Sequence, residues 1–219
     1  MKTALVTGAS GGIGAAIAQV LAPTHEVWLG GRKIPDGLPG HPWPVDLRDL
    51  DSLEDKTAEI PDLDVLVHSA GVIQLGPLSE TSVQTWRDTL ELNVIAVAEL
   101  TRILLPKLRA KNGHVILINS GAGLRVNPNW GSYGASKFAL RAFADALRAE
   151  EPDIRVTSVF PGRTDTEMQR GVRAAEQGDY QPEKYLKPDT VAQAVLNAIT
   201  MPADAHPAEV IIRPRATAG

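Results

Sequence analysis

Short apolar runs alternate with longer amphipathic stretches along the whole chain. Most of the short runs are apolar at nearly every position, which is typical of parallel strands covered on both faces. The predicted strands span residues 3–7, 26–30, 42–46, 64–69, 114–120, 155–160 and 209–214, and the predicted helices span about 12–22, 49–59, 80–111, 131–150 and 188–200. This alternation predicts an α/β fold with a doubly wound (Rossmann) parallel sheet of about seven strands and helices on both faces.

One long stretch, 161–187, lacks such a pattern and is interrupted by several Pro and Gly residues. Because long irregular connections in a compact domain are usually functional, we expect a variable lid over a substrate site here. No repeat, low-complexity tract or linker divides the chain, so residues 1–219 are predicted to form a single domain.

Composition removes several classes of function. The net charge is −4 and no face is rich in Lys and Arg, so we expect neither nucleic acid nor an anionic membrane as a partner. The absence of cysteine excludes disulfides, thiolate catalysis and Cys-ligated zinc, and the five histidines lack the spacing of metal ligands. No apolar run approaches the ~20 residues of a membrane span, and the first predicted strand leaves no room for a signal peptide, so we expect a cytoplasmic protein.

The sequence TGASGGIG (7–14) connects the first predicted strand to the first predicted helix. Gly8 permits a tight turn, Gly12 lets the backbone approach a pyrophosphate, and Gly14 allows close packing of helix on sheet. The free N–H groups and the positive dipole end of the helix then face the anion. We therefore predict a dinucleotide-binding turn, to which a glycine-rich turn without a ligand is the alternative.

A tyrosine and a lysine four residues apart occur twice, as Tyr133 with Lys137 and as Tyr180 with Lys184. At this spacing two side chains share one face of a helix. Pro182 argues against a regular helix around the second pair. The spacing alone does not decide which pair carries chemistry.

The order of motifs resembles the short-chain dehydrogenase/reductase family over nearly the whole chain. The glycine turn has that family's T-G-x-x-x-G-x-G spacing. The further matching stretches are HSAG (68–71), ELNVIAV (91–97), INSGAG (118–123), YGASK (133–137) and FPGRTDT (160–166). The second of these carries Asn93 on a predicted helix.

Ser120 ends the fifth predicted strand, thirteen residues before Tyr133, as in the family. Glu167 holds the equivalent position before Tyr180, so the resemblance favours Tyr133 over Tyr180. His68 and Ser69 replace both asparagines of the family's N-N-A-G motif, and we expect this change to affect strand packing more than chemistry. His68 is expected to be a core or cofactor-adjacent histidine.

The resemblance implies hydride transfer between a nicotinamide ring and a carbonyl or alcohol carbon. Tyr133 would be the general acid in reduction and the base in oxidation, with its pKa lowered by Lys137 and by the positive charge of the oxidised nicotinamide. Lys137 would also hold the nicotinamide ribose, Ser120 would hydrogen-bond the substrate oxygen, and Asn93 would position a water for proton relay. A catalytically idle, nicotinamide-sensing regulator on the same fold is the alternative.

The loop after the second strand predicts which cofactor is used. An acidic residue there favours NAD, whereas this chain has Gly31 followed by Arg32. A guanidinium can clamp a phosphate and Ser10 can add a hydroxyl contact, so we predict NADP, with NADPH preferred over NADH. The predicted cofactor-binding residues are Gly8, Ser10, Gly12, Ile13, Gly14, Gly31, Arg32, Asp46, Leu47, Ala70, Gly71, Asn93, Tyr133, Lys137, Pro161, Gly162, Thr164 and Thr166.

A small-molecule carbonyl or alcohol is the expected substrate, bound between the segment 121–130 and the lid. The predicted substrate-binding residues are Ser120, Leu124, Val126, Trp130, Tyr133 and Met168, while Arg125 and Arg163 are either pocket or surface residues. The resemblance also implies a homodimer or homotetramer built on the two long helices. Apolar residues available for this contact are Leu100, Ile103, Leu104, Phe143 and Leu147. The alternative is that these residues only face the sheet.

Overall fold

The fold is built on a seven-stranded sheet in the order β3-β2-β1-β4-β5-β6-β7, in which all paired strands are parallel. The structure is a computed structural model that describes residues 1–202 and 204–215. The strands are β1 (Lys2–Thr7), β2 (His25–Gly31), β3 (His41–Pro44), β4 (Val65–His68), β5 (His114–Ile118), β6 (Arg155–Pro161) and β7 (Glu209–Ile212). The predicted doubly wound fold is confirmed.

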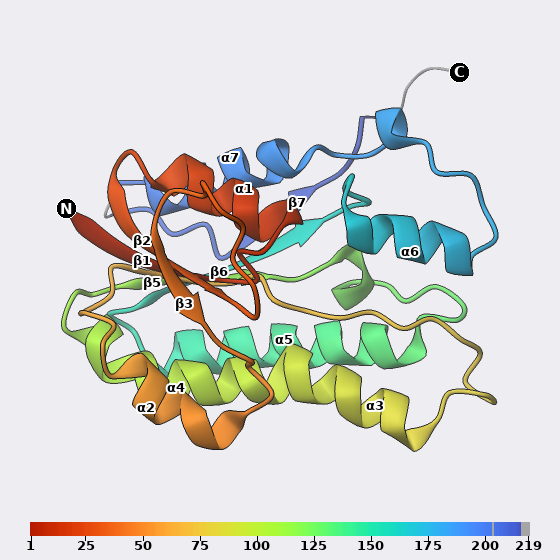
Figure 1. Cartoon of the computed structure of the whole chain (residues 1–219), viewed down its shortest axis with the longest axis horizontal. Helices are drawn as coiled ribbons and strands as arrows, with labels where there is room; N and C mark the ends of the chain where they lie inside the picture. Colours follow the sequence, from red (N-terminus) through yellow and green to blue (C-terminus); the bar gives the residue numbers. More distant parts are fainter. Residues whose placement is uncertain (203, 216–219) are drawn as a thin grey trace.

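Helices cover both faces of this sheet (Figure 1). One face carries α1 (Gly12–Leu21) and α7 (Pro188–Ile199), and the other carries α2 (Leu53–Thr57), α4 (Ala96–Arg109) and α5 (Gly131–Glu150). Each face has its own buried cluster, with Val67 packed toward α1 and α7 and its neighbour Leu66 toward α4 and α5. Because successive strand residues point to opposite faces, the central strands are apolar at nearly every position.

The edge strand β3 explains how two prolines fit into the sheet. β3 pairs only with β2, so the missing N–H groups of Pro42 and Pro44 remove no bond from a second neighbour. Trp43 between them is fully buried and its Nε1 donates to the backbone oxygen of Lys56 at 2.8 Å. A short 3₁₀ turn (Leu50–Ser52) then leads into α2, where the sequence predicts one helix over 49–59.

The predicted helix over 80–111 is in fact three elements. α3 (Val83–Leu90) passes into a π turn (Glu91–Ile95), which passes into α4. A π turn carries one residue more than an α-helix would use, and such turns are frequent at functional sites. The hydrophobic pattern did not reveal it, because the flanking residues suit an α-helix on both sides.

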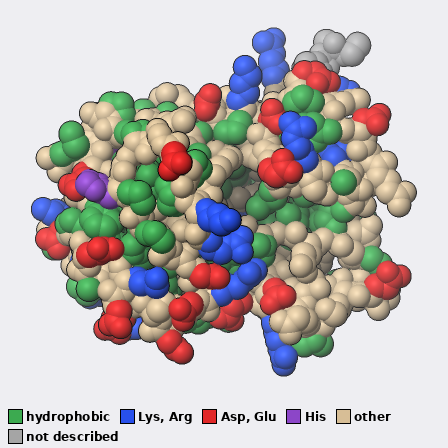
Figure 2. Space-filling view, in the orientation of Figure 1, with side chains coloured by type: hydrophobic (Ala, Val, Ile, Leu, Met, Phe, Trp, Pro, Cys, Tyr) green, Lys and Arg blue, Asp and Glu red, His purple; other side chains and the backbone are tan. Residues whose placement is uncertain are grey.

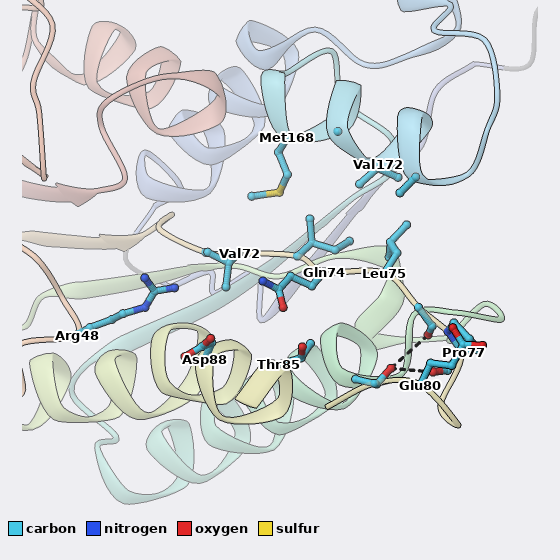
Figure 3. A pocket seen from close by; sticks show the side chains of 16 residues that line it. Arg48, Val72, Gln74, Leu75, Pro77, Glu80, Thr85, Asp88, Met168 and Val172 are labelled. Carbon is cyan, nitrogen blue, oxygen red and sulfur yellow. Dashed lines mark hydrogen bonds between the residues drawn. The ribbon is translucent and has the colours of Figure 1, made fainter. Parts of the chain in front are cut away.

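The predicted irregular region 161–187 also contains a helix, α6 (Glu167–Ala175), and a 3₁₀ turn (Pro182–Lys184). Thr166 caps α6, since its Oγ1 accepts a hydrogen bond from the backbone N–H of Gln169 at 3.2 Å. Met168 and Val172 lie on the side of α6 that faces the body of the protein (Figure 3). That this region acts as a lid stays a prediction.

The residues proposed for subunit contact are placed differently from expectation. Leu100, Leu104 and Leu147 are buried in the core of this chain and are not available to a second subunit, while Ile103 and Phe143 are only partly buried against that core. Exposed apolar side chains on this side include Val83, Ile95 and Phe138. Assembly into a homodimer or homotetramer stays a prediction, which light scattering would test. None of the helices in the described part of the chain has the length and hydropathy of a transmembrane segment.

The first glycine turn gives a test of the fold. A Cβ added at Gly14 would lie 2.2 Å from the backbone oxygen of Gly8, whereas a Cβ at Gly11 would have nothing within 4 Å. Gly11 is also extended, with φ of 173°, which any residue adopts. We expect Gly14→Ala to lower the free energy of unfolding by about 2–3 kcal/mol and Gly11→Ala to change it by less than about 0.5 kcal/mol. Urea unfolding of both variants measures this, and equal losses would contradict it.

Candidate active site

The carboxyl ends of β1 and β4 mark the point where the strand order reverses. Ligands of doubly wound sheets bind in the crevice at such a point. Thr7, the last residue of β1, fixes this edge: its Oγ1 donates to the Val67 oxygen and accepts from the backbone N–H groups of Ser69 and Ala70, at 3.1–3.3 Å. The two strand ends are therefore joined by a buried side chain before either turn begins.

The glycine turn is shaped to let backbone approach backbone. Gly8 has φ of +70°, and a Cβ there would lie 2.7 Å from the Ala70 nitrogen. Gly12 has φ of +54°, and its Cβ position is 3.2 Å from the Thr166 side chain. These are the conformations and clearances that only glycine supplies without strain. The turn leaves the N-terminus of α1 facing the crevice, which suits a phosphate group.

Tyr133 and Lys137 lie one turn apart on α5 and are both buried, at 8% and 5% exposure. The ammonium nitrogen of Lys137 is 5.7 Å from the centre of the Tyr133 ring and donates to the Ile118 oxygen at 2.9 Å. Burial lowers the pKa of Lys137 to about 8. The pair is thus a buried, interacting unit rather than two surface residues.

Asn93 lies in the π turn and connects this pair to the loop after β4. Its side-chain oxygen accepts from the Val72 N–H at 2.9 Å, and its amide donates to the Val72 oxygen at 2.9 Å and to Ser136 Oγ at 3.0 Å. Ser136 in turn donates to the backbone oxygen of Tyr133 at 2.7 Å. Both amide hydrogens of Asn93 are used in these bonds, so its side chain holds the loop after β4 to α5.

Ser120 follows β5 and faces Tyr133. Its Oγ accepts from the Ala122 N–H at 3.1 Å, and its own backbone N–H donates to Asn119 Oδ1 at 2.8 Å. The amide of Asn119 also donates to the Lys137 oxygen at 3.1 Å, which ties the Ser120 loop to α5. The structure therefore brings together all four predicted catalytic residues.

The shift of the tyrosine pKa differs from expectation. Burial raises the pKa of Tyr133, and a hydrogen bond with Ser120 opposes this shift only in part. The sequence predicts a lowering by Lys137 together with the oxidised nicotinamide, whereas the protein without cofactor shifts this pKa in the opposite direction. A phenol with a raised pKa stays protonated at neutral pH, which is the form that can donate a proton.

Two adjoining cavities open at this edge of the sheet. The catalytic cavity, of about 370 Å³, is lined by Ser120, Trp130, Tyr133 and Met168, all predicted substrate contacts. A larger cavity of about 840 Å³ lies between α3 and α6 and is crossed by the loop after β4 (Figure 3). Ile73, Met168 and Val172 line both cavities, so the two lie side by side. The face seen in Figure 2 is hollowed near its centre, with Lys and Arg side chains gathered beside the hollow.

Leu124 and Val126, also predicted to contact substrate, do not line either cavity. Val126 packs instead against Gly134 of α5, where an added Cβ would lie 2.6 Å from its side chain. Leu124 ends the short 3₁₀ turn Gly121–Gly123 and is only partly exposed. The turn folds this segment back onto α5, which the sequence did not reveal.

The predicted cofactor contacts all lie at the carboxyl edge of the sheet. Ile13, Pro161, Gly162, Thr164 and Thr166 line the catalytic cavity, and Gly71 lines the larger one. Ser10 Oγ lies against Gly31, since a Cβ there would be 2.5 Å away. Arg32 follows β2 and is exposed, as is Asp46 after β3, while Leu47 is buried in the core.

His68 and Tyr180 take no part in this cluster. Burial lowers the pKa of His68 to about 3, and its Nε2 lies 2.9 Å from Thr101 Oγ1, so it is a neutral core residue. Tyr180 lies in no helix; it hydrogen-bonds Asp165, and burial followed by that bond raises its pKa to about 12. Among the described residues, no group of three or more His, Asp or Glu is arranged to bind a metal.

Four residues of the site were not singled out from the sequence: Thr7, Asn119, Ser136 and Arg213. The first two stand beside predicted residues in quoted motifs, and Ser136 shares a helical face with Tyr133 by its i,i+3 spacing. Arg213 follows the last strand, and its side chain lines the catalytic cavity. Arg213 could have been found from its position just after a parallel strand, because the carboxyl ends of parallel strands meet at one edge of the sheet.

The family model described as short chain dehydrogenase matches residues 2–177. The chain belongs to the short-chain dehydrogenase family. A glycine betaine reductase of Emericella nidulans is 33% identical over 237 aligned residues, which are 98% of this chain and 19% of that protein. The chain therefore spans about a fifth of that relative.

Two solved structures of this short-chain dehydrogenase family are close in fold. An alcohol dehydrogenase from the archaeon Thermococcus sibiricus, complexed with 5-hydroxy-NADP, has a TM-score of 0.88 and 29% identity, covering 100% of this chain and 99% of that one. The closed form of serine dehydrogenase complexed with NADP+ has a TM-score of 0.87 and 28% identity, covering 99% and 97%. These findings support an oxidoreductase that uses a nicotinamide cofactor.

The buried Lys137 gives a pH-dependent prediction. Its pKa is lower in the folded protein, at about 8, than its ordinary value of 10.5, so between these values the unfolded chain holds more protons and stability rises with pH. From pH 8 to pH 10 the wild type should gain about 2 kcal/mol of unfolding free energy relative to Lys137→Met. Denaturant titrations of both proteins measure the difference; parallel pH profiles would refute it.

Proposed function

We propose that the protein is an NADP(H)-dependent carbonyl reductase that converts a small aldehyde or ketone to an alcohol. The observation that carries the proposal is the cluster of Ser120, Tyr133, Lys137 and Asn93 beside a glycine turn. Tyr133, Lys137 and Asn93 are buried, and Ser120 and Tyr133 line the catalytic cavity. A cavity of about 370 Å³ is large enough for a small substrate beside the reacting end of a dinucleotide. The regulator alternative is disfavoured because every polar group needed for proton transfer is present.

A bound reduced nicotinamide would supply the hydride, and the residues of the protein manage the proton. Tyr133 would donate its phenolic proton to the carbonyl oxygen as negative charge develops there. Its pKa is raised by burial, so the phenol carries that proton at neutral pH. Ser120 Oγ accepts from the Ala122 N–H, and its O–H, which interacts with Tyr133 in this structure, would donate to the substrate oxygen.

Lys137 and the two asparagines would set the geometry of transfer. The Lys137 ammonium uses one donor on Ile118, which leaves two donors for the cofactor ribose. Asn93 and Asn119 hold α5 at a fixed position relative to the loops after β4 and β5. A reacting pair of atoms depends on such positioning, since small displacements cost large factors in rate.

The cofactor preference is proposed from the end of β2. No acidic residue occupies position 31, and a Cβ there would meet Ser10 at 2.5 Å, so the space an aspartate needs is already taken. Among the described residues, no carboxylate pairs with Arg32, which leaves its guanidinium for a ligand phosphate. The two structural relatives above were both solved with NADP-type molecules, which supports this choice.

Replacement of the phenol tests the proton donor. Tyr133→Phe keeps the ring but removes the proton, so kcat for NADPH-dependent reduction of a neutral aldehyde should fall by about 100-fold or more. NADPH binding, followed by fluorescence, should change little. The control is Tyr180→Phe, which should stay within about two-fold of wild type. Wild-type turnover in Tyr133→Phe would show that Tyr133 is not the proton donor. A wild-type protein that reduces no carbonyl would favour the alternative of a nicotinamide-sensing regulator.

The phosphate clamp is tested by cofactor affinity. Arg32→Ala should weaken NADPH binding by about 10- to 100-fold and NADH binding by less than about three-fold, because only NADPH carries the 2′-phosphate. Arg102→Ala is the control, since Arg102 is an exposed residue of α4 paired with Glu99. Equal affinity of the wild type for NADH and NADPH would show that the end of β2 does not select the cofactor.

A further inference from the structure

The catalytic cavity carries an excess of positive charge. Arg125, Arg163 and Arg213 line it, and no Asp or Glu does so among the described residues. This contrasts with the net charge of −4 for the whole chain. Three guanidinium groups around a cavity that also holds Ser120 and Tyr133 set the kind of molecule that can bind there.

Arg213 is the best placed of the three. Its Nη1 donates to the Phe160 oxygen at 2.8 Å and to the Ile212 oxygen at 3.1 Å, which fixes the guanidinium at the end of β7. A Cβ built at Gly121 would lie 3.5 Å from the Nη2 of Arg213, and a Cβ built at Gly162 would lie 3.5 Å from its Cδ. The side chain therefore runs between the loops that follow β5 and β6, and Gly121 is the residue next to Ser120.

Arg213 also retains unused donors. Its Nη2 and Nε make no hydrogen bond, and no carboxylate pairs with it, in the part of the chain that the structure describes. Arg163 is different, because Glu176 binds it through two hydrogen bonds at 2.9 and 2.8 Å and so neutralises it. Arg125 is exposed at the same wall and has no ion-pair partner among the described residues. Two of the three charges thus face the cavity uncompensated.

A second observation points to a ligand at this place. Gln169 of α6 lines the catalytic cavity and is only 8% exposed, yet its Nε2 has no hydrogen-bond partner among the described residues. A buried amide donor without an acceptor costs free energy, so a ligand that supplies an acceptor is favoured. An anionic group bound in this cavity would give the free donors of Arg213 an acceptor, and Gln169 lines the same cavity.

We propose that the substrate is an oxo acid, whose carbonyl lies at Ser120 and Tyr133 while its carboxylate is bound by Arg213. A guanidinium offers two parallel N–H donors to a carboxylate, and this charge-assisted pairing is strong in a partly enclosed cavity. Arg125 and Gln169 complete the acidic-group subsite. This inference rests on the proposed carbonyl reduction, because it names the substrate class of the same site.

The test compares each acid with its own neutral ester. Pyruvate, acetoacetate and 4-oxopentanoate, each beside its methyl ester, are assayed with NADPH for the wild type and for Arg213→Met. We expect kcat/KM of the wild type to favour the best acid by about ten-fold or more, and Arg213→Met to lower that preference by about 10- to 100-fold, mainly through KM. Arg102→Met serves as a surface control that should keep the wild-type preference.

The other outcomes separate the two proposals. Reduction of esters and neutral aldehydes without preference for any acid overturns the oxo-acid inference and leaves carbonyl reduction standing. Loss of NADPH affinity in Arg213→Met with an unchanged acid preference assigns the residue to the cofactor and also overturns it. If no carbonyl is reduced, calorimetry with glutarate and with its dimethyl ester on the NADP+-loaded protein still tests the subsite. Binding of glutarate but not of the ester, lost in Arg213→Met, supports the subsite. Absence of glutarate binding refutes it.

Discussion

The contact between Gly14 and the carbonyl oxygen of Gly8 is the constraint on which the rest of the site depends. A methyl group would not fit between them, and the same is true between Gly8 and the Ala70 nitrogen. Helix α1, strand β1 and the turn after β4 therefore meet through backbone alone. Thr7 adds the hydrogen bonds that hold the two strand ends together. These backbone contacts set the width of the crevice at the switch point, independently of the ligand-binding side chains.

The catalytic half of the site is organised in another way, by buried amides. Asn93 and Asn119 each connect α5 to a different loop, and each uses both its donor and its acceptor. Satisfied polar networks of this kind rigidify a region, whereas a half-satisfied one would be costly. Lys137 is the member of this network that lowers the stability of the fold, because burial disfavours its charged form. The protein gives up stability at neutral pH to keep an ammonium beside Tyr133, as active sites commonly do.

Much of the fold and the catalytic cluster could be predicted from the sequence, because strand runs and turn glycines report local requirements directly. All seven strands follow from such local signals, while Tyr133 and Ser120 were assigned from the order of the motifs along the chain. The π turn could not be predicted, since Glu91–Ile95 has ordinary helix-forming residues and its register is decided by the contact of Asn93 with Val72. Val126 was misplaced because only the folded chain shows that it packs on Gly134. Arg213 was missed because it lines the catalytic cavity only by virtue of where the last strand ends.

The π turn has a consequence for how this chain can change over time. Removing one residue from Glu91–Ile95 would restore an unbroken α-helix with good propensity, but it would rotate one flanking helix by about 100° relative to the other. Either Asn93 would leave Val72 and Ser136, or the leucines of α4 would leave the core. The segment therefore tolerates almost no change in length. A gap here in an alignment with a relative would mark a protein whose proton chemistry is arranged differently, even where its tyrosine and lysine are intact.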